Sequence, residues 1–328
     1  MCPQFVDFDA DGHTDIITAT YEGTVFISRG SHKGWGKPEH LIDAAGEYLV
    51  LSLYYDMEED TYKNAKRSPE GQSNPKDHCV SAMVWDWDAD GDFDILLGAK
   101  EGRLYLRMNH GKPGSPKFDT TNQLLRAGGE DFNVPGGLTA PRLVDWDADG
   151  LKDLVCGSFK GGVYFYRNVG EKKAPKFAKP VALISPGVCQ PSDLRFPNSG
   201  CYADPVDYDG DGDLDLLVGG YCSVAPKKRI LDVKEKARLK ELVAKTSSLS
   251  KEMNVILSKH AADTSDMSKE EGRKAFEILR ALKPYRENRE AWGKVWAERR
   301  TFQPTGSRTA GVWLYRRIAK ETAAVQPR

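Results

Sequence analysis

The sequence predicts an all-β fold, a β-propeller of four-stranded antiparallel blades with an α-helical hairpin inserted in blade four. Three observations predict it: an aspartate-rich nine-residue loop occurs four times, short apolar stretches flank each loop, and one long segment has helical spacing. The loops begin at Asp7, Asp86, Asp145 and Asp207, so their starts lie 79, 59 and 62 residues apart. Repeats of this size are typical of propellers, solenoids and arrays.

The size and composition of the chain are those of an ordinary globular protein. It has 328 residues, of which 40% are hydrophobic, and a formal net charge of −1. This balance gives no case for a protein that binds nucleic acid or lies on a membrane surface. No apolar run approaches the roughly 18 residues of a membrane span, and the N-terminus has no signal-peptide pattern. We therefore expect no nucleic-acid partner and no transmembrane segment.

Each repeat has the pattern of a β-meander. The stretches before and after each loop, such as "SAMVW" and "DILLG", are too short for helices and rich in residues that favour strands. A glycine-containing turn and an alternating aromatic strand follow, as in "KGGVYFYRNVG", and in two repeats "PKF" leads to a fourth apolar stretch. One repeat is therefore predicted to be a four-stranded blade of about 60 residues.

Blade four is interrupted by a segment of different character. After "DLLVGGYCSVAPKKR" the chain is rich in Lys, Glu, Ala and Leu, and "TAGVWLYRRIA" at residues 309–319 then matches the third strand of the other blades. We therefore assign residues 1–229 to blades one to four up to the insertion, 230–304 to a helical hairpin insertion, and 305–328 to the return strand and tail.

The insertion is predicted to form two helices. Residues 232–262 carry apolar residues at mostly helical spacing, and a second helix is expected from Ser268, where "SKEE" forms a capping box with Glu271. Pro284 should end or kink this helix. Residues 232–300 contain 17 Lys and Arg against 12 Asp and Glu, which predicts a solvated basic face, with an acidic partner as the alternative.

Each aspartate-rich loop has the spacing of a metal site. Carboxylates at loop positions 1, 3, 5 and 9 can converge on a hard cation, glycine at position 6 allows the turn, and position 7 offers its backbone carbonyl. Calcium is preferred because it tolerates irregular oxygen coordination, whereas magnesium demands a stricter octahedron. Position 12 is not glutamate in any loop and the flanks are strands, which excludes an EF-hand.

Solvated acidic turns are the alternative to metal sites, because Asp and Gly are common turn formers. Four loops that each keep all four aspartates while position 7 varies favour metal binding. We expect about four structural Ca²⁺ ions, one in each loop, with no other cofactor and no recognisable catalytic residue. The predicted ligands are Asp7, Asp9, Asp11, His13, Asp15, Asp86, Asp88, Asp90, Asp92, Asp94, Asp145, Asp147, Asp149, Leu151, Asp153, Asp207, Asp209, Asp211, Asp213 and Asp215.

The loop pattern DxDxDGxxD, followed by D-[IL]-apolar-apolar-G and G-x-[VL]-[YFW]-x-[YL]-R-N-x-G, resembles the FG-GAP/VCBS repeats of bacterial surface proteins, which are related to the integrin α-subunit propeller. The resemblance covers nearly all of the chain except the insertion, and it includes the sixteen aspartates and Gly12, Gly91, Gly150 and Gly212. It implies a calcium loop between the first two strands of each blade, and an extracellular, periplasmic or cell-surface protein.

Integrin-like propellers have seven blades, whereas four repeats are recognisable here. The chain is therefore expected to be part of a longer propeller, or a small four-bladed one with an exposed edge. Ala19 also departs from the pattern, because it stands where the other blades have glycine after the second strand.

Three functions are compatible with these features. The first is a calcium-stabilised binding module for adhesion, with a polysaccharide or protein ligand. The second is a propeller-type, lyase-like enzyme acting on polysaccharides, and the third is a scaffold whose hairpin mediates contacts. The six histidines are scattered singly and neither GxSxG nor HExxH occurs, which disfavours the enzyme. The irregular segment 52–78 is expected to be an ordinary long loop, with a functional loop as the alternative.

Several other side chains have structural interpretations. Cys189 and Cys201 could form a disulfide or remain buried thiols. The pair Trp292 and Trp296 is expected to anchor the hairpin to the propeller. Aromatic residues at loop position 2 and in the third strands are expected to pack between blades rather than to stack on sugars. They are Phe8, Trp87, Trp146 and Tyr208 in the loops, and Tyr105, Tyr166 and Tyr315 in the strands.

Overall fold

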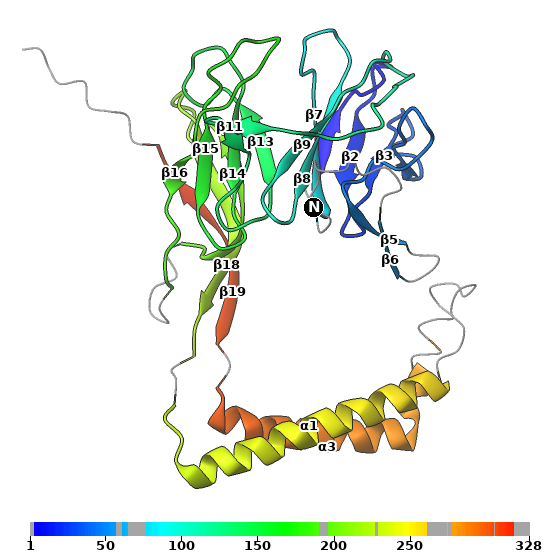
Figure 1. Ribbon diagram of the computed structural model, residues 1–328, viewed down its shortest axis with the longest axis vertical. Coiled ribbons are helices and arrows are strands. Elements are labelled where there is room, and N and C mark those ends of the chain that lie inside the picture. Colours follow the sequence, from blue (N-terminus) through cyan, green and yellow to red (C-terminus); the bar gives the residue numbers. More distant parts are fainter. Residues whose placement is uncertain are drawn as a thin grey trace, which may run out of the picture. The chain divides into compact units, whose positions relative to one another are not determined.

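The computed structural model describes residues 3–56, 61–64, 77–189, 196–226, 229–260, 274, 277–304 and 306–317. The chain divides into two compact units. The first, residues 1–223 with 308–328, holds the β-sheets, and the second, residues 224–307, holds the helices (Figure 1). No helix in the described part of the chain is long and apolar enough to cross a lipid bilayer.

The sheet unit contains one antiparallel sheet for each repeat of the sequence. Neighbouring strands follow chain order, and the aspartate loop joins the first strand to the second. Repeat one contains β1 (Gln4–Val6), β2 (Asp15–Ala19), β3 (Val25–Ser28) and β4 (Glu39–His40); repeat two contains β7 (Cys79–Trp85), β8 (Asp94–Ala99), β9 (Leu104–Arg107) and β10 (Gln123–Leu124); repeat three contains β13 (Ala140–Val144), β14 (Asp153–Gly157), β15 (Val163–Tyr166) and β16 (Val181–Ile184); and repeat four contains β17 (Ser199–Val206), β18 (Asp215–Val224) and β19 (Ser307–Tyr315).

The third strand of repeat four comes from beyond the helical segment. In the sheet, β19 lies beside β18, although residues 225–306 separate the two strands in the chain. The return strand predicted at residues 309–319 is therefore present as far as Tyr315, and residues 318–319 lie outside the described part. A mostly β fold with several four-stranded antiparallel sheets and an inserted helical element is confirmed.

Three hydrophobic cores lie between consecutive repeats. The first includes Ile17 of repeat one and Ile95 of repeat two, the second includes Leu96 and Leu154, and the third joins repeats three and four in the same way. The sheets therefore pack in series, each against the next (Figure 1). A closed ring is not seen among the described residues, so the predicted propeller is not confirmed as such.

A glycine in the second strand lets the next repeat approach closely. A Cβ atom at Gly98 would lie 1.9 Å from the carbonyl oxygen of Thr139, and one at Gly157 would lie 2.1 Å from that of Cys201. Gly219 has the same position in repeat four, yet a Cβ atom there would have no described atom within 4 Å. Among the described residues, therefore, repeat four has no close neighbour at the glycine through which repeats two and three contact their successors.

The aromatic residues at loop position 2 show the same difference. Phe8 is buried and stacks on Phe93 of repeat two, with ring centroids 6.0 Å apart. Trp87 and Trp146 pack against the second and third cores. Tyr208 is 56% exposed, so the predicted packing is wrong there, because no described residues follow repeat four in the stack. The third-strand residues Tyr105, Tyr166 and Tyr315 pack in the cores as predicted.

The structure decides between the disulfide and the buried thiols that the sequence left open for Cys189 and Cys201. Cys189 forms a disulfide with Cys222, and their Cα atoms lie 6.0 Å apart. Cys201 is a buried free cysteine, so the thiol alternative is confirmed for this residue and the Cys189–Cys201 bridge is wrong. The reason is the packing of Cys201, which lies on β17 and is buried in the core between repeats three and four.

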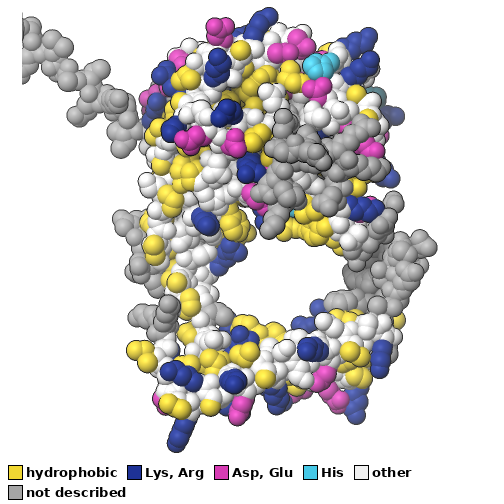
Figure 2. All heavy atoms as spheres, viewed as in Figure 1, with side chains coloured by type: hydrophobic (Ala, Val, Ile, Leu, Met, Phe, Trp, Pro, Cys, Tyr) yellow, Lys and Arg dark blue, Asp and Glu magenta, His cyan; other side chains and the backbone are white. Residues whose placement is uncertain are grey.

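Smaller elements lie outside the four main sheets. Within segment 52–78, β5 (Leu53–Asp56) and β6 (Thr61–Asn64) form a two-stranded hairpin, and residues 57–60 and 65–76 lie outside the described part. A second short pair is β11 (Arg126–Ala127) with β12 (Glu130–Asp131). Acidic and basic side chains are interspersed over the visible face of the sheet unit, in keeping with a net charge near zero (Figure 2).

The helical unit contains α1 (Val233–His260) and α3 (Lys283–Phe302), which pack around Leu242, Leu249 and Val295. Reciprocal hydrogen bonds cap the start of α1. The backbone N–H of Glu235 donates to Asp232 Oδ1 at 2.8 Å, and that of Asp232 donates to Glu235 Oε2 at 3.0 Å. The predicted first helix is therefore present up to His260.

Of the second predicted helix, the structure describes only the later part. Leu282 has extended backbone angles and α3 begins directly after it with Pro284 in its first turn, as expected for a proline that ends one helix and starts another. Ser268 and Glu271 lie outside the described residues. Trp292 packs against the core of the hairpin itself, and its ring lies 5.7 Å from that of Trp296. An anchoring role for the two tryptophans stays a prediction.

Candidate metal centres

The four aspartate loops share one backbone conformation. We call residues 7–15, 86–94, 145–153 and 207–215 loops one to four. The position-1 carboxylate accepts hydrogen bonds from the backbone further along the loop. Asp7, for example, accepts at 3.0 Å from the N–H groups of both Asp11 and Gly12. Positions 4 and 6 have positive φ angles of 56° to 102° in every loop, which glycine at position 6 adopts without strain.

The position-9 aspartates attach each loop to the third strand. Asp94 accepts hydrogen bonds from the backbone N–H of Trp87 at 2.8 Å and from that of Asn109 at 2.7 Å. Asp15, Asp153 and Asp215 make the equivalent pairs of bonds in the other loops. Burial raises the pKa of Asp94 to about 6, and the two N–H donors oppose this rise. These carboxylates therefore hold the loop in place whether or not they also bind metal.

Side-chain oxygens converge at one point in each loop. Position 1 and position 3 contribute to all four groups, and the third member is at position 5 or position 9. Within each group the ligand atoms lie no more than 4.8 Å apart. The groups are Asp7, Asp9 and Asp15; Asp86, Asp88 and Asp90; Asp145, Asp147 and Asp153; and Asp207, Asp209 and Asp211. Several Asp clusters could therefore hold ions.

The remaining predicted ligands lie outside these groups. At position 5, Asp11 and Asp149 each accept a hydrogen bond from the backbone N–H of the position-7 residue, at 2.8 and 3.0 Å. The position-7 residues themselves were predicted to offer backbone carbonyls. Their ligand role stays a prediction, as does that of the position-9 aspartates in loops two and four. These residues are His13, Asp92, Leu151, Asp213, Asp94 and Asp215.

Carboxylate oxygens that have no hydrogen-bond partner indicate whether these groups fit a cation. Oδ1 of the position-3 aspartate is buried without a hydrogen-bond partner in three loops, at Asp9, Asp88 and Asp147. Asp92 in loop two is 5% exposed, and its Oδ1 also has no partner. A buried carboxylate oxygen without a donor is costly, and a hard cation would satisfy it. The donor set therefore fits an oxygen-binding metal such as Ca²⁺.

Arginines at the end of the third strand neutralise three of the loops. Arg29 forms an ion pair with Asp9 of loop one, and Arg316 Nη1 lies 3.2 Å from Asp209 Oδ2 in loop four. In loop three, Arg167 bridges two aspartates: its Nε lies 2.6 Å from Asp147 Oδ2, and its Nη2 lies 3.0 Å from Asp149 Oδ2. In each of these three loops, an arginine side chain already forms an ion pair with one or two of the aspartate carboxylates.

Loop two has no such counter-ion. Met108 is the residue of repeat two that corresponds to Arg167 of repeat three. The correspondence follows from the next residues, Asn109 and Asn168, whose backbone N–H groups each donate to the position-9 aspartate of their own loop at 2.7 Å. Among the described residues, no Lys or Arg forms an ion pair with a loop-two aspartate, although this loop has five of them. Loop two therefore has as many aspartates as loop four, but it is the one loop whose aspartates form no ion pair with a described arginine or lysine.

The pKa shifts follow this difference. Burial first, and then the charges of Asp90, Asp88 and Asp86, raise the pKa of Asp92 in loop two. In loop three the backbone N–H of Leu151, and then Arg167, lower the pKa of Asp149. After these first causes, neighbouring carboxylates raise the pKa of Asp92, whereas a neighbouring arginine lowers that of Asp149. The arginines were not among the predicted site residues, although the motif "YRN" in repeat three and its counterpart "RMN" in repeat two carry the signal.

Part of repeats three and four is similar to a known repeat family. A search of curated proteins returned no match. Residues 145–218, from the first aspartate of loop three to the second strand of repeat four, match the model of the FG-GAP-like repeat. This stretch includes loops three and four and the packing of Gly157 on Cys201. The FG-GAP resemblance is thereby confirmed, with the match extending over residues 145–218.

Proposed function

We propose that the sheet unit is a calcium-stabilised β-propeller module that binds a polysaccharide or protein ligand. The observation that carries the metal part is the repeated position-3 aspartate, whose Oδ1 is buried without a hydrogen-bond partner at Asp9, Asp88 and Asp147. An acidic turn exposed to water would leave these oxygens solvated, so their burial supports a resident cation.

Calcium is the metal that best matches the donors. All candidate side-chain ligands are carboxylate oxygens, and the groups of three leave room for backbone carbonyls and water. Such irregular oxygen-rich coordination suits Ca²⁺ better than Mg²⁺. Each ion would join the first two strands of a repeat and reduce the repulsion among its aspartates. Its role is therefore structural, in loops one to four alike.

The proposed ligand-binding function rests on the repeated arrangement of the sheets. Four antiparallel sheets pack in series through three cores, and residues 145–218 match an FG-GAP-like repeat. Such repeats are typical of extracellular proteins, so we propose an extracellular, periplasmic or cell-surface location. Rigid sheets with variable loops at their ends are suited to ligand recognition in adhesion.

Thermal unfolding with and without millimolar Ca²⁺ tests this proposal. A ligand that binds only the folded chain raises its unfolding temperature, and bound calcium should be measurable after gel filtration at up to about four ions per chain. Mg²⁺ at the same concentration should have a smaller effect. No rise and no bound metal would contradict the proposal and would leave the loops as acidic turns.

A further inference from the structure

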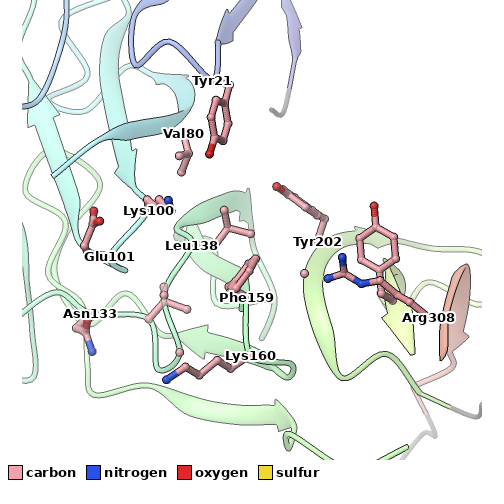
Figure 3. A pocket seen from close by; sticks show the side chains of 15 residues that line it. Tyr21, Val80, Lys100, Glu101, Asn133, Leu138, Phe159, Lys160, Tyr202 and Arg308 are labelled. Carbon is pink, nitrogen blue, oxygen red and sulfur yellow. The ribbon is translucent and has the colours of Figure 1, made fainter. Parts of the chain in front are cut away.

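A pocket of about 750 Å³ lies in the sheet unit and is lined by residues of all four repeats (Figure 3). Its lining includes Lys100 and Lys160, which lie in the turns between the second and third strands of repeats two and three. The aspartate loops join the first and second strands, so they lie at the opposite end of the antiparallel sheets. The pocket is therefore separate from the candidate metal centres.

Exposed aromatic rings form part of the pocket wall. Tyr21 is 65% exposed, Phe159 is 54% exposed and Tyr221 is 40% exposed. These rings come from repeats one, three and four, and none belongs to the cores between repeats. Aromatic rings at a concave surface offer flat apolar faces, and a volume of this size is within the range of about 300–1,000 Å³ typical of ligand sites.

Three cationic side chains line the same pocket: Lys100, Lys160 and Arg308 (Figure 3). Among the described residues, none of the three is in an ion pair, and Glu101 is the only acidic residue of the lining. The Arg308 guanidinium lies 4.1 Å from the centroid of the Tyr221 ring, which holds its planar group against an aromatic face. The lining therefore has an excess of positive charge, although the chain as a whole has a net charge of −1.

We propose that this pocket binds a short stretch of an anionic glycan. Phe159 and Tyr21 would contact the apolar faces of sugar rings, while Lys100, Lys160 and Arg308 would pair with carboxylate or sulfate groups. A neutral sugar could contact the aromatic rings but would form no ion pair with the three cations, which are exposed to water and available to an anion. An acidic peptide would satisfy the cations but would make less use of the aromatic faces. This inference rests on the proposed binding function and assigns its site and ligand class.

Isothermal titration of the calcium-loaded full chain with trigalacturonate tests the ligand class. The methyl ester of the same trisaccharide is the matched probe without charge, and we expect it to bind at least about tenfold more weakly. A heparin trisaccharide carries sulfate as well as carboxylate groups and distinguishes the two anion types. Triglutamate tests an acidic peptide, and we expect it to bind at least about tenfold more weakly than the better of the two glycans.

Single substitutions test the site. Phe159→Ala, Lys160→Ala and Arg308→Ala should each weaken glycan binding by about tenfold, because each removes a ring face or a paired cation. Lys172→Ala is the matched control, because Lys172 is an exposed lysine in the turn after the third strand of repeat three and does not line the pocket. Each variant should keep the calcium-dependent rise in unfolding temperature of the unmodified chain, which verifies folding separately from binding.

Several results would overturn the inference. Equal binding of the methyl ester would exclude an anionic ligand, and equal binding of triglutamate would indicate an acidic peptide site. An equal loss with Lys172→Ala would indicate unspecific attraction by surface charge. Failure of both anionic glycans to bind, while calcium still raises the unfolding temperature, would remove the glycan pocket and leave the calcium module intact. Loss of the calcium effect itself would instead contradict the proposed function.

Discussion

Loops two and three have the same nine-residue pattern but a different charge balance. Both curl around a position-1 carboxylate, and both attach to the third strand through a buried position-9 aspartate. Arg167 contacts two aspartates of loop three, whereas Met108 occupies the equivalent position beside loop two. Loop two also has a fifth aspartate, Asp92, where loop three has Leu151.

This difference indicates that the direction of the carboxylates and their charge balance are set by different residues. The loop residues themselves set the direction of the carboxylates, through turns and backbone hydrogen bonds. The residue at the end of the third strand, about 20 residues later, decides how much of the negative charge is already neutralised. We therefore expect the stability of repeat two to depend most strongly on calcium, and the following predictions test that ranking.

The largest effect is expected from Asp88→Asn. This change removes a candidate ligand whose Oδ1 has no hydrogen-bond partner, and it replaces a carboxylate by a neutral group of the same shape. In calcium-loaded protein the unfolding temperature should fall by about 5–10 °C, because binding energy at loop two is lost. In calcium-free protein it should stay constant or rise slightly, because one repelling charge is removed. Thermal unfolding in both conditions checks this, and an equal fall in the two would contradict a metal role.

A smaller effect is expected from Met108→Arg. An arginine here would provide loop two with the counter-ion that Arg167 gives to loop three, and it would compete with calcium for the same carboxylates. We expect the calcium affinity of loop two to weaken about tenfold, and the calcium-free protein to become slightly more stable. Met108→Leu is the control, because it keeps the apolar packing without adding charge. Unchanged calcium affinity in the arginine variant would show that the strand-end residue does not control this loop.

The smallest effect is expected from the reverse change, Arg167→Met. Loop three would then lack its ion pairs, as loop two does, but the exposed position of Arg167 limits the loss. The unfolding temperature of calcium-free protein should fall by about 1–2 °C, and the rise on adding calcium should become larger. Lys172→Met removes an exposed cation of the same repeat and should change neither quantity. If Arg167→Met behaved like Lys172→Met, the arginine would have no role in the balance.

Much of the fold could be predicted from the sequence because the repeat is local. The alternation of apolar residues, the turn glycines and the match of residues 309–319 to an earlier strand locate the strands of each repeat. Side-chain partners between repeats depend on packing that no local pattern records. Cys189 pairs with Cys222 because Cys201 faces a core, and Tyr208 is exposed because no described repeat follows it.

The candidate metal centres could be predicted only in part for the same reason. The converging carboxylates at positions 1 and 3 lie close together in sequence, and their grouping follows from the loop pattern. The arginines that balance them come from a different strand, so their contribution required the register of the sheet. The pocket lined by Lys100, Phe159 and Arg308 draws its residues from separate repeats and has no motif of its own.

Isothermal titration of calcium into metal-free protein tests the central claim most directly, when the unmodified chain is compared with Asp88→Asn and Asp147→Asn. These two changes remove the equivalent position-3 carboxylate from loops two and three, and both affect an unpartnered buried oxygen. We predict that Asp88→Asn removes the tightest binding event and that Asp147→Asn removes a weaker one. Loss of the tightest event in Asp147→Asn alone, or no heat of binding in the unmodified chain, would contradict the account.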